Sequence, residues 1–156
     1  MGTRSNIAIK NDDGSYDLIY CHWDGYLDNN GVILFKNYRE EEKVRNLIKH
    51  GSASSLKKRV DPIHPENHSY DDPDGETTVF YHRDRDEDWE DVSTQLGLTV
   101  KNETELRQEE YLYLWKDGEW WTCFYDHPMM KLLDALKNDE QSLKKIASFL
   151  EPDSKV

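Results

Sequence analysis

The chain has 156 residues, of which 20 are Lys or Arg and 32 are Asp or Glu, so its formal charge is −12. This length suits one domain. The net negative charge argues against non-specific electrostatic binding to nucleic-acid phosphates. We expect no membrane span and no signal peptide, because no apolar run approaches the ~20 residues that a crossing helix needs. Hydrophobic residues make up 36%, and a 12% aromatic share supplies large buried areas.

Hydrophobic periodicity and turn signals predict an α+β fold, an antiparallel sheet built from hairpins with helices packed on one face, in a single domain over residues 1–156. Asp13-Gly14 and Asp117-Gly118 each separate two strand-like runs and are strong hairpin signals. The expected elements are strands at 6–10, 16–21, 77–82, 110–116 and 119–125, and helices at 31–50 (two pieces), 128–137 and 139–150. Between them, acidic loop-rich segments are expected at about 61–76 and 83–95.

The two cysteines, Cys21 and Cys123, lie in strand-like apolar stretches and form no CxxC pair. A free cysteine in such a stretch packs as a small hydrophobe, so we expect both to be buried and reduced. Reduced thiols favour a cytoplasmic protein.

A cluster of chemically versatile residues, CHWDGY, follows the second predicted strand. His22, Asp24 and Tyr26 supply hydrogen-bonding and acid–base groups, Trp23 supplies a stacking plane, and Gly25 allows a sharp turn. The cluster is a candidate ligand site. The alternative is a structural corner, with the aromatic rings in the core and Asp24 capping the turn.

A second polar motif, Gly2-Thr3-Arg4-Ser5, stands immediately before the first strand. A guanidinium beside a hydroxyl suits a phosphate or a carboxylate. If the first two strands form a hairpin, Arg4 and Ser5 lie opposite the CHWDGY segment, and the two motifs build one site. The alternative is an ion pair between Arg4 and Asp24 that only locks the corner.

The negative charge is concentrated, because eleven acids and two arginines between Glu66 and Asp91 give that stretch a net charge of −9. Such a stretch is usually a solvated loop. The alternative is a surface that imitates the phosphates of DNA and occupies a nucleic-acid-binding protein, with an aromatic anchor among the acids. The candidate partner-binding residues are Asp84, Asp86, Glu87, Asp88 and Trp89.

The remaining motifs are weaker indications of function. His64 and His68 have i, i+4 spacing, but neighbouring prolines argue against a helix there, and we expect no dedicated metal site and no cofactor. The aromatic residues of the second hairpin could stack on bases, although alternation predicts that one face of the hairpin packs beneath the C-terminal helices.

The opening MGTRSNIAI, the segment YCHWDGY and Gly31 resemble a group of small uncharacterised proteins encoded by tailed phages and some bacteria. The family pattern has a proline after DGY, where this chain has Leu27. The resemblance implies a phage accessory protein in the host cytoplasm, acting on host machinery or host defence.

Three functions follow from these patterns. The first is a host-interaction or counter-defence protein that binds a small anionic ligand, a nucleotide, without turnover, using Arg4, Ser5, His22, Trp23, Asp24 and Tyr26. The second is an acidic inhibitor of a host nucleic-acid-binding protein. The third is a nucleotide phosphodiester hydrolase with His22 as general base oriented by Asp24. We do not expect direct nucleic-acid or membrane binding. The sequence is compatible with a homo-oligomer.

Overall fold

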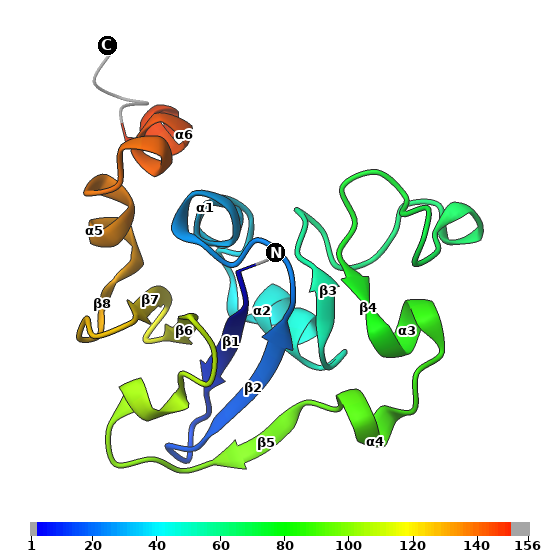
Figure 1. The fold of residues 1–156 in the computed structure, drawn as a ribbon, viewed down its shortest axis with the longest axis horizontal. Coiled ribbons are helices and arrows are strands. Elements are labelled where there is room, and N and C mark those ends of the chain that lie inside the picture. The colour runs from blue at the N-terminus through cyan, green and yellow to red at the C-terminus, as the bar shows by residue number, and fades with distance from the viewer. Residues whose placement is uncertain (1–2, 151–156) are drawn as a thin grey trace.

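The computed structural model describes residues 3–150 and confirms the α+β fold, with a mostly antiparallel sheet and helices against one of its faces (Figure 1). The strands are β1 (Ser5–Lys10), β2 (Tyr16–Cys21), β3 (Ala53–Ser55), β4 (Val79–Phe80), β5 (Gln95–Leu98), β6 (Tyr111–Lys116), β7 (Glu119–Phe124) and β8 (Met130–Lys131). The helices are α1 (Val32–Asn37), α2 (Glu41–Ile48), α3 (Tyr81–Arg85), α4 (Trp89–Val92), α5 (Leu132–Lys137) and α6 (Glu140–Leu150), with a π-helical turn at Leu27–Gly31 and 3-10 turns at Pro65–Asn67 and Glu103–Leu106.

The strand order in the sheet is β4-β3-β2-β1-β6-β7-β8, and β5 also pairs with β2 (Figure 1). The hairpins β1–β2 and β6–β7 are antiparallel, as predicted. They join through a parallel pairing of β1 with β6, and β2 also pairs in parallel with β3. The prediction of a sheet built from hairpins therefore does not account for the centre of the sheet. There the two hairpins, which are distant in sequence, lie side by side through the parallel β1–β6 pair.

The main core lies between the sheet and α1, α2, α5 and α6. Ile7, Ile19 and Tyr113 face it from the strands, and Leu34 and Leu47 face it from the helices, all at 1% exposure or less. Strand alternation sends the residues between them to the other face. The helices thus cover one face of the sheet, as the sequence predicts.

The second face carries its own smaller core. Ala8, Leu18 and Leu114 are buried there beneath the segment between β5 and β6 (residues 99–110), which we call the cover. Leu106 of this segment packs against them. Asn6 fastens this cover, because its side-chain oxygen accepts hydrogen bonds from the backbone N–H groups of Gln108 (2.7 Å) and its neighbour (2.9 Å). The cover therefore packs on β2, β1, β6 and β7.

Several predictions are confirmed locally. Asp117 and Gly118 have φ angles of 54° and 77°, the positive values that a tight two-residue hairpin turn requires. The helical stretch after residue 31 divides into α1 and α2, and Gly51 follows with φ 81°. Cys21 and Cys123 are free and buried, one in each core, so they lie on opposite faces of the sheet.

Other boundaries differ from the prediction. The expected strand at 77–82 is only β4, because the Asp84 carboxylate accepts a hydrogen bond from the Phe80 backbone N–H (2.8 Å) and α3 begins at the next residue. The expected helix at 128–137 begins at Leu132, since Met130 pairs with Thr122 of β7. The segment expected to be loop-rich at 83–95 contains most of α3 and all of α4.

Candidate functional site

The start of the described chain and the bend after β2 meet, as the sequence predicts. Ser5 pairs with Cys21 in the β1–β2 register, which places Arg4 beside His22 one step further along. The Gly25 backbone N–H donates a hydrogen bond to the Thr3 carbonyl oxygen (2.7 Å). Gly2 lies outside the described residues. The two polar motifs therefore form one corner of the molecule.

The inner half of this corner is filled by protein. Ser5 and Asn30 are fully buried, and the Asn30 side-chain amide donates hydrogen bonds to the Ser5 hydroxyl (3.2 Å) and the Cys21 thiol (3.5 Å). Tyr113 donates its hydroxyl to the Gly25 carbonyl oxygen (2.5 Å). A Cβ on Gly25 would lie 2.8 Å from the Ser5 Cβ, so only glycine fits. The Ser5 hydroxyl is thus occupied within the protein and is not open to a ligand.

The outer half is exposed. Arg4 is exposed, and Trp23 and Tyr26 retain 42% and 39% exposure. Asp24 has a φ of 57°, and its carboxylate accepts a hydrogen bond from the Tyr26 hydroxyl (3.1 Å). The His22 and Trp23 rings meet edge to face at 4.7 Å. The structural alternative, which placed the aromatic rings of CHWDGY in the core, is therefore wrong for Trp23 and Tyr26, whereas Ser5 is packed within the protein.

His22 is held by a residue that the sequence analysis did not single out. Its Nδ1 lies 2.5 Å from the Tyr20 hydroxyl, and the Arg4 guanidinium lies beside the same hydroxyl. Burial raises the pKa of Tyr20 more than Arg4 lowers it, so the phenol is neutral at neutral pH. Asp24 is engaged with Tyr26 instead, so the His22–Asp24 pairing needed by a hydrolase is not formed. Alternation along β2 could have identified Tyr20, since it shares a face with His22.

Arg4, Tyr20 and His22 point to the second face of the sheet, next to the end of the cover, where Glu109 lies close enough to Tyr20 to raise its pKa. Three residues from neighbouring elements lie on the same side: Ser54 of β3, Tyr70 of the following loop and Tyr81 at the start of α3. The Ser54 and Tyr70 hydroxyl oxygens are 3.3 Å apart, and the Tyr70 and Tyr81 rings are 6.0 Å apart. We call the set Arg4, Tyr20, His22, Ser54, Tyr70 and Tyr81 the open-face platform.

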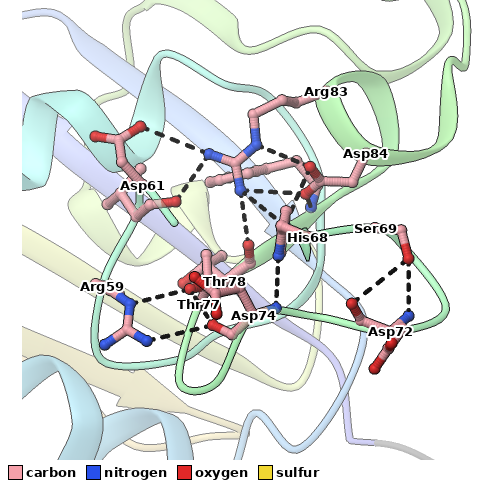
Figure 2. A network of polar contacts seen from close by, with 12 residues as sticks. Arg59, Asp61, His68, Ser69, Asp72, Asp74, Thr77, Thr78, Arg83 and Asp84 are labelled. Carbon is pink, nitrogen blue, oxygen red and sulfur yellow. Dashed lines mark hydrogen bonds and ion pairs between the residues drawn. The ribbon is translucent and has the colours of Figure 1, made fainter. Parts of the chain in front are cut away.

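The candidate partner-binding residues separate into buried and exposed groups. The Asp84 side chain is 5% exposed and accepts hydrogen bonds from the Arg83 Nε (2.9 Å) and the Phe80 backbone (Figure 2). Burial alone would raise the pKa of Asp84, but these donors outweigh it, and the pKa is lowered. Asp84 is therefore a structural residue with no surface left for a partner.

His68 belongs to the same buried network. Its Nδ1 accepts a hydrogen bond from the Asp74 backbone N–H (2.9 Å), so the neutral ring carries its proton on Nε2, 3.2 Å from the Asp84 carboxylate (Figure 2). Arg83 completes the network by donating to the carbonyl oxygens of Val60 (2.8 Å) and Thr78 (2.9 Å). The network fastens the loop before β4 to α3.

The remaining acidic candidates are more accessible. Asp86 and Asp88 are exposed, and the Glu87 carboxylate forms an ion pair with the Arg85 Nε (3.0 Å). Trp89 is 40% exposed, and the rest of its ring lies against Gly51. The three acidic residues form the short link between α3 and α4, and Trp89 is the first residue of α4.

Metal and membrane chemistry receive no support from the part of the chain that the structure describes. Between residues 3 and 150, no three His, Cys, Asp or Glu side chains converge as a metal site would require. No helix in the same range has the length and apolar character needed to cross a bilayer.

A groove of about 780 Å³ runs along α2. Its Lys43 and Arg45 are already bonded, to the Asn37 carbonyl oxygen and the Glu41 carboxylate respectively.

Comparison of the chain with protein-family models, with curated proteins and with solved structures gives no match.

Proposed function

We propose that the protein is a phage-type accessory factor of the host cytoplasm that binds a small anionic ligand, a nucleotide, at the open-face platform without turning it over. The observation that carries this proposal is the position of Arg4, which is exposed and lies beside His22 at the end of β2. The guanidinium takes the phosphate, because its planar fork of N–H donors matches phosphate oxygens.

The other residues of the corner complete the binding. Trp23 or Tyr26 stacks on the base, since both rings are free at one side. The hydrogen bond between the Tyr20 hydroxyl and His22 Nδ1 orients the imidazole ring and leaves Nε2 free of that bond, where it can contact a polar atom of the ligand. Asp24 orients polar edges of the base.

Adenosine 5′-monophosphate tests the site by thermal shift and by titration calorimetry. We expect the wild-type protein to be stabilised and Arg4→Ala to lose the shift. Arg39→Ala, an exposed arginine that stacks on Phe35 of α1, is the matched control and should keep it. An unchanged mass of the recovered nucleotide separates binding from hydrolysis. The absence of a shift across the common nucleotides would contradict the proposal.

Trp23 offers a second test, because Trp89 has nearly the same exposure and serves as its control. Trp23→Phe should weaken nucleotide binding and reduce ligand-induced fluorescence quenching. Trp89→Phe should leave both unchanged. Equal effects of the two substitutions would show that the base does not stack at the corner.

An acidic inhibitor of a host nucleic-acid-binding protein is a second candidate. Its support is the buried network of Asp84, which anchors α3 directly before the link that carries the exposed carboxylates of Asp86 and Asp88. A basic partner captured at low salt should dissociate at high salt, because exposed ion pairs are screened. The double variant Asp86→Asn, Asp88→Asn should lose this capture, and capture that survives the substitutions excludes the surface.

A further inference from the structure

A second guanidinium lies at the end of the platform opposite Arg4. Arg85 of α3 stacks on the rings of Tyr70 and Tyr81, at 4.8 and 5.7 Å from their centres. The hydrogen bond to the Tyr70 hydroxyl raises the pKa of Arg85. Arg85 therefore remains a cation next to aromatic rings, as Arg4 does next to Tyr20.

The platform between the two arginines is continuous. Arg4 directly precedes β1 and Tyr81 directly follows β4, and β2 and β3 lie between those strands (Figure 1). Adjacent strands are ~4.8 Å apart, so the two ends are separated by roughly 14 Å across three spacings. Tyr20 and Ser54 occupy the interval, and Tyr20 lies close enough to Tyr81 to contribute to the raised pKa of the Tyr81 phenol.

We infer that the ligand carries two phosphate groups linked through a sugar that bears a planar base, the chemistry of a 5′-phosphorylated dinucleotide, with Arg4 holding one phosphate and Arg85 the other. This inference rests on the proposed function and specifies its ligand class. The phenol rings between the two arginines provide the surface on which the planar base lies, because aromatic side chains stack on bases irrespective of sequence.

Glu87 occupies the place of the second anion in the free protein. Its carboxylate lies 3.0 Å from the Arg85 Nε, and the two side chains are 32% and 52% exposed. Exposed ion pairs of this kind contribute little free energy, so a phosphate can replace the carboxylate. Glu87 thus competes with the ligand for Arg85 and has no contact with Arg4.

The experiment compares adenosine 5′-monophosphate with the 5′-phosphorylated dinucleotide pApA by calorimetry. We expect pApA to bind the wild-type protein at least tenfold more tightly, and Arg85→Ala to abolish this difference while the monophosphate still binds. Arg4→Ala should weaken both ligands. Glu87→Gln, which keeps an acceptor for Arg85 but removes the competing charge, should strengthen pApA binding twofold to threefold. Arg39→Ala should change neither ligand.

The outcomes separate the inference from the function on which it depends. Monophosphate binding that needs Arg4, combined with pApA binding that Arg85→Ala does not alter, overturns the second subsite and leaves the proposed function standing. Weaker pApA binding in Glu87→Gln also overturns it. If neither nucleotide binds the wild-type protein, the function and the inference fall together.

Discussion

The Asp84 carboxylate lies among donors that folding has removed from water. Arg83 and the Phe80 backbone both donate to it, and its side chain is only 5% exposed. Asp84→Ala would remove the acceptor of the Phe80 N–H and leave Arg83 with only its longer ion pair to the exposed Asp61 (3.7 Å), so we expect the free energy of unfolding to fall by about 3–5 kcal/mol. Urea denaturation measures this loss. Asp91→Ala, an exposed carboxylate on α4, should change stability by less than about 0.5 kcal/mol, and equal losses would contradict the structural role.

Asp84 also gives stability a defined pH dependence. Its pKa is lowered from the ordinary value of 3.8, so the folded protein binds fewer protons than the unfolded chain as the pH falls below about 4. The contribution of Asp84 is therefore present above that pH and is lost as the pH falls through the folded pKa. Denaturation curves between about pH 6 and pH 3 should show a shallower loss for Asp84→Asn than for the wild type. Parallel losses would show that Asp84 is not the titrating group.

At the scale of elements, the sequence predicts local structure well and non-local structure poorly. The two hairpins carry their own turn signals, so Gly14 and Gly118 identify them without knowledge of the rest of the fold. The three-residue β3 and the bulged β5 have no such signal, because β3 exists through pairing with β2 and β4, and β5 through pairing with β2. The sequence predicts that Arg4 and His22 lie opposite each other, because both positions follow from the register of the single β1–β2 hairpin. Tyr70, Tyr81 and Arg85 reach the platform through β3, β4 and α3, which local patterns do not place.

The cover on the second face depends on one side chain of β1. Asn6 is fully buried, and its oxygen accepts the backbone N–H groups of Gln108 and Glu109. Asn6→Ala removes this acceptor, so we expect a loss of about 1–3 kcal/mol in unfolding free energy and faster hydrogen exchange at those amides. Asn6→Asp keeps an acceptor oxygen and should retain most of the amide protection. Unchanged exchange in Asn6→Ala would show that the cover is held by Leu106 and its apolar contacts alone.

At the scale of the whole molecule, repulsion among carboxylates opposes the compact state. The net charge is −12, and nine of these charges lie between residues 66 and 91, while Arg83 is already committed to a buried ion pair. Salt screens exposed charges over a Debye length of about 10 Å at 0.1 M but acts much less on buried pairs.

We therefore expect the melting temperature to rise as sodium chloride increases from about 0.02 to about 0.2 M at neutral pH, because screening relieves repulsion more than it weakens exposed ion pairs. Differential scanning calorimetry measures the trend. The triple variant Asp71→Asn, Asp86→Asn, Asp88→Asn removes three exposed charges and should be more stable at low salt and less sensitive to salt. A melting temperature that falls with salt in the wild type would mean that surface ion pairs such as Arg85–Glu87 outweigh the repulsion, and the acidic segment would then be a stabilising network.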